Sequence, residues 1–374
     1  MKIQMCDLVG QYKKIQAEVD AAMSQVINSS AFINGPQVKE FKTGLEIFTG
    51  AKHVIPCANG TDALQIALMA LGLQPGDEVI VPAFTYVAAA EVIGLLRLIP
   101  VMVDVDAGSF NITLYNIEKG LSEKTKAIIP VHLFGQTCPM EEIMNFAQKH
   151  DLFVVEDNAQ AIGAQYTFSD GSTRQAGTIG HIGCTSFFPT KNLGCFGDGG
   201  AMMCEDDALA ERLRVMTVHG QTVKYHHELL GCNSRLDTLQ AAILNVKLQH
   251  LDEYIQARQQ AAKIYSEGLA GIDGITLPKE MPYSTHVYHQ YTFKVKDGKR
   301  NALKTYLSEH GVPSMIYYPL PLNEQNAFKS ITRAAENLDV SKELADSVLS
   351  LPMHTELTAE EQEYVIANVK NFFN

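Results

Sequence analysis

The chain has 374 residues, of which 46% are hydrophobic and 19% charged, and its formal net charge is −12. This is the composition of an ordinary globular protein, and the negative charge argues against non-specific nucleic-acid binding, which depends on clustered lysines and arginines. Single hydrophobic cores stop growing near roughly 250–300 residues. We therefore expect a large domain over residues 1–250 and a small C-terminal domain over residues 251–374.

The cysteines and the apolar runs bear on the compartment. Seven cysteines are scattered without a Cys-x-x-Cys pair, which favours reduced thiols over a disulfide frame or a zinc site. The adjacent His226 and His227 lack a third ligand at zinc spacing. The amino terminus lacks a signal-peptide core, and no apolar run approaches the roughly 18 residues of a membrane span. We expect a cytoplasmic protein with no metal site and no membrane partner.

The order of the predicted elements indicates an α/β fold. Helix-like apolar spacing over 11–28 and 36–49 predicts an N-terminal helical segment. Five strand-like runs then alternate with four helix-like segments: strands at 54–58, 78–81, 100–103, 127–131 and 152–155, and helices at 63–73, 87–97, 113–121 and 140–150. This alternation predicts a mainly parallel sheet that binds its ligand at the carboxyl ends of the strands.

The second half of the chain has a different pattern. A helix is expected at 206–218, followed by a polar loop over 225–235 and one long amphipathic helix from Leu236 toward Tyr265, which would link the domains. Beyond residue 270 we expect strands at 291–295 and 314–318 and helices at 300–310 and 359–371. This mixture predicts a smaller α+β C-terminal domain.

Lys191 is the candidate reactive group. It lies between Phe187, Phe188 and Leu193 in a glycine-rich stretch that ends at Gly200. Apolar surroundings penalise the ammonium form and so turn a lysine into a useful nucleophile toward a carbonyl. The alternative is a surface lysine in a glycine-rich turn.

Two strand ends offer groups for a ligand. Gly60 and Thr61 follow the first strand and begin a helix, where free backbone amides favour an anion such as phosphate; a plain helix cap is the alternative. Tyr86 follows the second strand and is placed to stack on a flat heterocycle or to join the core.

Asp157 lies just past the fifth strand, and Gln160 follows three residues later. A carboxylate at this edge can hold a pyridine nitrogen protonated, and the Gln160 amide can bind a ring hydroxyl. A helix cap is again the alternative for Asp157.

These motifs together resemble the DegT/DnrJ/EryC1/StrS family of sugar-nucleotide aminotransferases, which use pyridoxal phosphate (PLP), and the resemblance covers essentially the whole chain. Five segments carry it in order: Asn59-Gly60-Thr61-Asp62-Ala63-Leu64, Phe84-Thr85-Tyr86, Glu156-Asp157-Asn158-Ala159-Gln160, Ser186 to Gly194, and Asn233-Ser234-Arg235-Leu236-Asp237. The resemblance implies the PLP fold type I.

Site roles follow from the same resemblance. It implies that Lys191 bonds the cofactor covalently and moves the proton, and that Asp157 pairs with the ring nitrogen. Gln160 would contact the ring hydroxyl, and Tyr86 would stack on the ring. The phosphate would be bound by Gly60, Thr61 and Ser186 of one subunit and Asn233 of the other, so the active unit would be a homodimer.

A finer resemblance concerns the substrate. The Tyr225-His226-His227 segment, the run from 233 to 244 and Asn323 resemble enzymes that aminate a UDP-linked 3-keto-hexuronic acid at C3. Arg235 would grip the sugar carboxylate through two hydrogen bonds, or form an interface ion pair. Tyr318 and Tyr317 offer hydroxyls to a substrate. Tyr317 departs from the His that this branch has before Tyr-Pro, so the substrate end could differ.

The implied reaction moves an amino group from glutamate to the keto-sugar nucleotide and makes an amino sugar for a surface polysaccharide. Three alternatives remain. The first is an aminotransferase acting on a 4-keto-6-deoxy sugar nucleotide. The second is a dehydratase of the same family, against which Lys191 argues because such enzymes lack it. The third is a catalytically silent sugar-nucleotide-binding or regulatory protein on the same scaffold.

Overall fold

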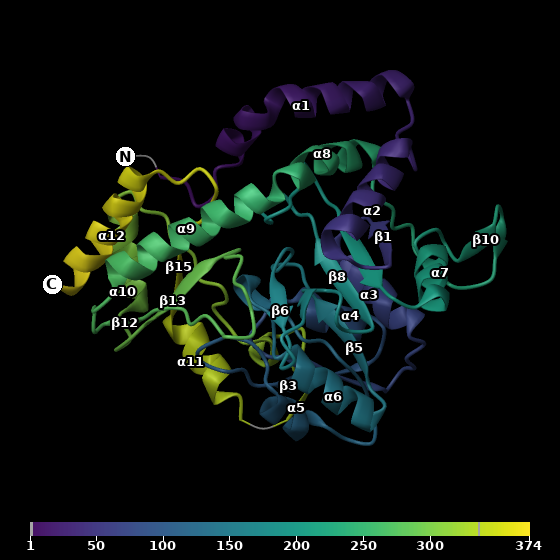
Figure 1. Ribbon diagram of the computed structural model, residues 1–374. Coiled ribbons are helices and arrows are strands. Elements are labelled where there is room, and N and C mark those ends of the chain that lie inside the picture. Colours follow the sequence, from purple (N-terminus) through teal and green to yellow (C-terminus); the bar gives the residue numbers. More distant parts are fainter. Residues whose placement is uncertain (1–2, 336) are drawn as a thin grey trace.

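A twisted β-sheet flanked by helices forms the body of the protein, shown in Figure 1 as a computed structural model. The structure describes residues 3–335 and 337–374, so the first two residues of the predicted large domain lie outside it. Within the described residues the main sheet has eight strands in the order β1-β9-β8-β5-β4-β2-β3-β14. Their bounds are β1 His53–Cys57, β2 Glu78–Pro82, β3 Ile99–Val103, β4 Thr125–Ile128, β5 Phe153–Asp157, β8 Ile182–Ser186, β9 Gly200–Cys204 and β14 Arg333–Ala334.

Strand direction decides where the candidate site lies. Neighbouring strands from β14 to β8 pair in parallel, and only β9 runs antiparallel to both β8 and β1. The carboxyl ends of β1, β2, β4, β5 and β8 therefore meet at one edge of the sheet. The mainly parallel α/β sheet of a PLP fold type I protein, predicted from the sequence, is confirmed.

Helices cover both faces of the sheet. Their bounds in the large domain are α1 Leu8–Ser29, α2 Pro36–Thr49, α3 Gly60–Ala70, α4 Ala88–Leu95, α5 Leu114–Gly120, α6 Met140–His150, α7 Asp207–Met216 and α8 Thr238–Gln249. Side chains alternate along a strand, so Val54 packs with α2 and α8, whereas its neighbour Ile55 packs with α3 and α7. Helix α1 lies along α8 (Figure 1), where Ile15 and Val19 contact Ile243.

The C-terminal part is a smaller α+β unit, as expected. An antiparallel sheet of β12 (Ile275–Thr276), β13 (Tyr291–Val295) and β15 (Val348–Leu351) packs against α9 (Leu251–Leu269), α10 (Arg300–Glu309) and α12 (Ala359–Phe373). The chain also returns to the large sheet, because β14 pairs with β3 and α11 (Asp339–Ser347) buries Leu344 in the main core. A division of the chain at residue 250 stays a prediction.

Several expected elements were wrong. Residues 314–318 form one isolated bridge, Met315 to Ser350, and no strand; the flanking Pro313 and Pro319 lack the N–H that a ladder needs. The single long helix is two helices, α8 and α9, because His250 has a non-helical backbone (φ −102°, ψ 2°). The start of the expected polar loop forms β11 (His226–His227), which pairs with β10 (Gln221–Val223) just before it in a hairpin that projects from the body (Figure 1).

Other strands were missed altogether, namely β6 (Gln165–Thr167), β7 (Thr173–Gln175), β8, β9, β12, β14 and β15. Glycines interrupt the apolar runs of β8 and β9, which hid them from a search for apolar periodicity. In the described part of the chain, no helix is both long and apolar enough to cross a membrane.

Candidate active site

Lys191 lies in a loop that begins directly after β8. Backbone hydrogen bonds from Phe187 to Gly199 and from Cys195 to Phe187 close this loop. Phe187 and Leu193 are fully buried, whereas Phe188 is half exposed, so two of the three apolar neighbours expected around the lysine anchor the loop. The Lys191 amine has no hydrogen-bond or ion-pair partner within residues 3–335 and 337–374. Burial lowers its pKa to about 8, against the opposing charge of Asp157.

Asp157 ends β5, and its side chain is 5% exposed. One carboxylate oxygen accepts the Ala159 amide at 3.0 Å, and no donor in the described chain bonds the other oxygen. Burial raises the pKa of Asp157, although the Ala159 bond and the Lys191 charge lower it. Burial thus outweighs the mutual attraction of Asp157 and Lys191 at both groups. Asp157 caps a turn, not a helix.

The start of α3 faces the end of β8. A methyl group added at Gly60 would lie 2.7 Å from the Ser186 Cβ, so the two residues are in close contact. The side chain of Asn59 caps α3 by accepting the Asp62 amide at 2.8 Å. The amides of Gly60 and Thr61 have no acceptor in the described chain, which leaves two donors beside the Ser186 hydroxyl. Asn59 is therefore the residue that caps α3, and Thr61 lies in the first turn of the helix.

Gln160 connects the end of β5 to the C-terminal part. Its Oε1 accepts the Phe134 amide at 2.8 Å, and its Nε2 donates to the Tyr318 hydroxyl at 3.2 Å. The second hydrogen of Nε2 remains for a ligand. Burial raises the pKa of Tyr318, which keeps its hydroxyl protonated.

Aromatic rings lie beside this contact. The rings of Tyr86 and Tyr318 are 6.2 Å apart, as are those of Phe84 and Tyr318, and the Tyr317 and Tyr318 rings are 5.9 Å apart. Tyr86 is 55% exposed, so it is not a core residue, and one face is open to a ligand. Leu322 donates to the Ala83 carbonyl at 2.9 Å, which brings Asn323 to the same turn. The Asn323 Oδ1 is buried without a partner in the described chain.

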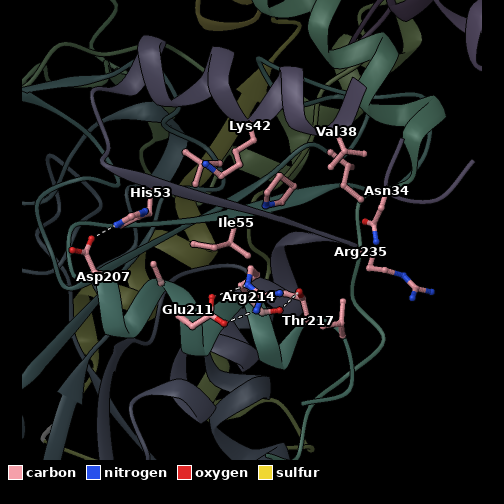
Figure 2. Close-up of a pocket in the computed structure, with 15 residues that line it drawn as sticks. Asn34, Val38, Lys42, His53, Ile55, Asp207, Glu211, Arg214, Thr217 and Arg235 are labelled. Atoms are coloured by element: carbon pink, nitrogen blue, oxygen red, sulfur yellow. Dashed lines mark hydrogen bonds and ion pairs between the residues drawn. The ribbon is translucent and has the colours of Figure 1, made fainter. Parts of the chain in front are cut away.

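Two predicted residues lie elsewhere in the protomer. Figure 2 shows Arg235 at a cavity of about 400 Å³ lined also by Asn34, Val38 and His53. Its guanidinium extends away from the ion pairs that Asp207 and Glu211 form in this cavity. Asn233 is exposed, and its side chain bonds none of the residues at the start of α3. Neither residue meets Lys191 within one protomer.

His289 was missed by sequence reasoning. It is 6% exposed, and its Nδ1 has no partner in the described chain. Burial, then the charges of Lys191 and Arg258, lower its pKa well below the ordinary value. The Asn192 side chain, next to Lys191, donates to the Val287 carbonyl at 2.9 Å and so ties this segment to the lysine loop. No local pattern marks His289, because the contacts come from residues about 100 positions away.

The comparisons with known proteins agree with this arrangement. The model of the DegT/DnrJ/EryC1/StrS aminotransferase family matches residues 13–370. The chain belongs to this family, and the resemblance stated from its motifs is confirmed. Members of the family are PLP-dependent sugar aminotransferases, which makes this protein a transaminase.

Three curated relatives cover nearly the whole chain. A "pleiotropic regulatory protein" of Geobacillus stearothermophilus is 45% identical over 100% of this chain and 99% of its own length. The "UDP-2-acetamido-2-deoxy-3-oxo-D-glucuronate aminotransferase" of Pseudomonas aeruginosa is 42% identical over 99% of this chain and 100% of its own. A 3-aminotransferase of Acidithiobacillus ferrooxidans named for UDP-N-acetyl-3-dehydro-α-D-glucosamine is 43% identical over 98% and 96%.

Solved structures share the fold. A DegT DnrJ EryC1 StrS aminotransferase from Brucella abortus has a TM-score of 0.94 and 40% identity, with both chains covered completely. A Bacillus subtilis protein solved with bound pyridoxamine phosphate has a TM-score of 0.88 and 30% identity, over 96% of this chain and 82% of its own. PLP, the cofactor expected from the sequence, is the cofactor of this family. The partner-free lysine, the open carboxylate oxygen and the free helix amides described above fit it.

Proposed function

We propose that the protein transfers the amino group of glutamate to C3 of a UDP-linked 2-acetamido-3-keto-hexuronic acid, which yields an amino sugar for a surface polysaccharide. The observation that carries this proposal is the Lys191 amine, which lacks a protein partner in the described chain and has a pKa of about 8 beside Asp157. The names of the Pseudomonas and Acidithiobacillus relatives support C3 of a UDP-sugar as the position aminated.

Lys191 is suited to carry a proton. With a pKa of about 8, roughly a tenth of the amine is neutral at pH 7, about 300-fold more than for an ordinary lysine. Nζ can therefore take a proton from a substrate carbon and return it. When bound, PLP supplies an electron sink for the charge left on that carbon.

The other residues of the candidate site would hold and orient the cofactor. The open oxygen of Asp157 would accept an N–H from the cofactor ring, and Gln160 would donate its second amide hydrogen to the ring hydroxyl. Gly60, Thr61 and Ser186 would bind the phosphate, because amides at a helix N-terminus favour an anion. Tyr86 would cover one ring face with its exposed side.

In this proposal, residues of two protomers together form the substrate-binding part of the site. Tyr317, Tyr318 and Asn323 would contact the sugar from the protomer that holds Lys191. Arg235 and Asn233 lie away from their own Lys191, so we assign their roles to the site of a second copy, in a homodimer. We place the reaction in the cytoplasm, where the seven free cysteines stay reduced.

The carboxylate separates two candidate substrates. The Pseudomonas relative is named for a glucuronate and the Acidithiobacillus relative for a glucosamine, which has no carboxylate. If Arg235 grips the carboxylate, Arg235→Ala should lower kcat/KM for the uronate at least 100-fold, because hydrogen bonds to charged groups contribute about 1.5–3 kcal/mol each. The same variant should change kcat/KM for the neutral 3-keto-glucosamine nucleotide less than threefold. An equal loss with both sugars would contradict this role.

One experiment tests the whole proposal. The visible absorption band of the PLP-loaded protein is followed after glutamate and then after the UDP-3-keto-hexuronate. Loss of the band and its return would support both half-reactions, with Lys191→Ala as the inactive control. Loss without return would remove the sugar assignment, and a 4-keto-6-deoxy sugar nucleotide would be tried next.

A second candidate has support from the Geobacillus relative, which is named a regulatory protein. A silent sugar-nucleotide-binding protein predicts no turnover with any donor or acceptor, even when the cofactor is bound. Activity of the wild type and its loss in Lys191→Ala would exclude it.

A further inference from the structure

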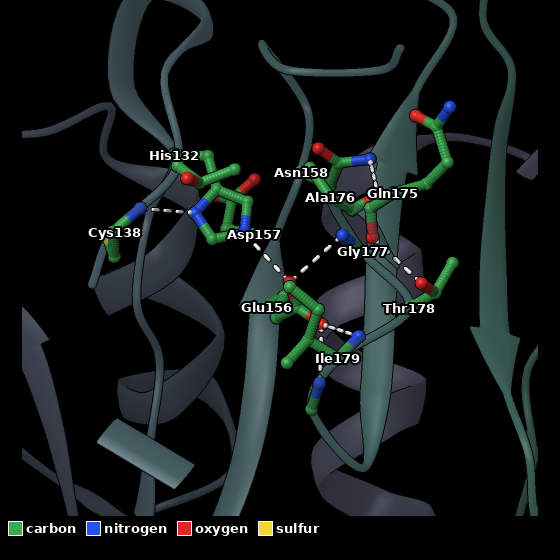
Figure 3. Close-up of polar contacts among 12 residues, drawn as sticks. His132, Cys138, Glu156, Asp157, Asn158, Gln175, Ala176, Gly177, Thr178 and Ile179 are labelled. Atoms are coloured by element: carbon green, nitrogen blue, oxygen red, sulfur yellow. Dashed lines mark hydrogen bonds and ion pairs between the residues drawn. The ribbon is translucent and has the colours of Figure 1, made fainter. Parts of the chain in front are cut away.

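A buried carboxylate lies directly behind the candidate site. Glu156 precedes Asp157 on β5, and because side chains alternate along a strand the two point to opposite faces. The Glu156 side chain is fully buried and accepts four hydrogen bonds, as Figure 3 shows. The donors are His132 Nε2 at 2.8 Å and the amides of Gly177 at 2.9 Å, Ile179 at 2.7 Å and Gly180 at 2.5 Å. None of the roles proposed above uses this residue.

Glu156 is held in its charged form. Burial raises its pKa, but the His132 bond and the amides of Gly177 and Gly180 outweigh burial and keep the pKa below its ordinary value. His132 cannot neutralise this charge, since its Nδ1 accepts the Cys138 amide at 3.2 Å and so carries no hydrogen. The imidazole is therefore neutral, with its proton on Nε2, and the pair carries one negative charge.

The same histidine also fixes Asp157. Its backbone amide donates to the Asp157 carbonyl at 3.0 Å, while the Asp157 amide donates to the Pro130 carbonyl at 2.9 Å. The His132 main chain thus binds the peptide of Asp157, and its side chain binds Glu156. His132 therefore contacts both residues, Asp157 through its main chain and Glu156 through its side chain.

The negative charges of Glu156 and Asp157 act on the same buried region. The Cys138 thiol has its pKa raised well above the ordinary value, first by burial and then by Glu156, with a smaller effect of Asp157. The titratable groups around Asp157 are Lys191, His132, Cys138, Cys184 and Tyr318. Of these, Lys191 is the one that can balance a negative charge without a cofactor.

We propose that His132 and Glu156 form a positioning unit for Asp157, which fixes the end of β5 and holds a second buried negative charge that favours a proton on the ligand nitrogen bound by Asp157. This inference rests on the proposed role of Asp157. His132 and Glu156 touch neither cofactor nor substrate in it, so they are positioning residues and act through Asp157.

Pyridoxamine phosphate is the suitable probe, because its binding does not need a covalent bond to Lys191. We would measure its dissociation constant for the apoprotein by equilibrium dialysis at pH 6 and pH 9. His132→Leu removes the donor to Glu156 and should weaken binding about tenfold at pH 6, where the bound nitrogen is protonated; tenfold corresponds to one pKa unit of the bound nitrogen. The loss should be smaller at pH 9, because the advantage disappears as the bound nitrogen loses its proton. His132→Gln, which keeps an amide donor toward Glu156, should restore most of the affinity.

His354→Leu is the matched control. His354 is also buried, and its Nδ1 also accepts a backbone amide at 3.2 Å, from Glu356, but it bonds no carboxylate in the described chain. It should lower the melting temperature of the apoprotein without changing the pH dependence of binding. If His132→Leu fails to fold, His132→Asn, whose shorter amide does not reach Glu156, replaces it with the same expectation.

Three outcomes are distinct. A loss of affinity that is about tenfold at pH 6 and shrinks toward pH 9 supports the positioning unit. A loss that is equal at both pH values, or below twofold, overturns it and leaves a purely structural pair. If the wild type does not bind the probe, or Asp157→Asn binds it as tightly, the proposed role of Asp157 fails and this inference with it.

Discussion

Replacement of Lys191 by methionine should stabilise the apoprotein while it abolishes catalysis. The lysine amine has a pKa of about 8 instead of its ordinary value of 10.5, mainly because of burial. A lowered pKa means that the folded state binds a proton less readily than the unfolded state. At neutral pH the protonated amine therefore opposes folding, and a methionine of similar length removes this cost.

The magnitude follows from the pKa values. The fall of the Lys191 pKa from 10.5 to about 8 corresponds to about 3 kcal/mol at pH 7, since a tenfold change in proton affinity contributes about 1.4 kcal/mol. The unfolded state binds more protons between pH 8 and pH 10.5, so wild-type stability rises with pH across this window. The advantage of the variant should fall to about 1.4 kcal/mol at pH 9.5 and disappear above the unfolded pKa.

Thermal denaturation of the two apoproteins at pH 7 and pH 9.5 measures this difference. For a chain of this size, about 3 kcal/mol corresponds to a rise in melting temperature of roughly 4 °C. Lys247→Met is the control, because Lys247 is also buried with a pKa of about 8 but donates to the Gly194 carbonyl at 2.6 Å. Removing it leaves a buried carbonyl unpaired at a cost of about 1–3 kcal/mol, so its net gain should be much smaller.

Two results would refute this reasoning. A Lys191→Met protein no more stable than the wild type at pH 7 would mean that the amine is not desolvated. A gain that is the same at pH 7 and pH 9.5 would mean that packing, and not charge, explains the difference.

Two further predictions concern other parts of the fold. Gly60→Ala places a methyl group 2.7 Å from the Ser186 Cβ and should weaken binding of PLP at least tenfold in equilibrium dialysis. The control Gly44→Ala meets only a flexible leucine and should leave PLP binding unchanged. Equal PLP affinities of the two variants would contradict the phosphate assignment. Arg333→Ala removes the two-pronged ion pair with the buried Glu78 and should cost about 2 kcal/mol at pH 7 by thermal denaturation. Burial raises the pKa of Glu78, but the hydrogen bonds from Arg333 and Ser122 and the Arg333 charge together outweigh it and lower this pKa. The loss should therefore shrink as pH falls below about 4; a loss that persists there would contradict the ion-pair explanation.

The parts of the candidate site that lie at strand ends could be predicted from the sequence. Gly60 and Asp157 each follow a short apolar run, and parallel strands bring their carboxyl ends to one edge of the sheet. The structure does bring Gly60 to Ser186 and Asp157 to Lys191. Their assigned chemistry stays a prediction, but their proximity follows from strand direction.

Other features depend on contacts that no local pattern encodes. Residues 314–318 have the composition of a strand, yet Tyr318 bonds Gln160 and only Met315 pairs with another strand. His289 and Glu156 are surrounded by groups from distant parts of the chain. A reading of periodicity could not find these partners, because their sequence separation carries no signal.

The sequence by itself determined the family and the α/β class and predicted which lysine is reactive, because these depend on residue order and on local patterns of apolar and glycine residues. Only the tertiary structure decided which charges are buried together. Burial lowers the pKa of Lys191 and raises that of Asp157, and the hydrogen bonds from His132 and the loop at 177–180 keep Glu156 charged. Desolvation and hydrogen bonding are properties of packed neighbours, and packing brings together residues that the chain keeps apart.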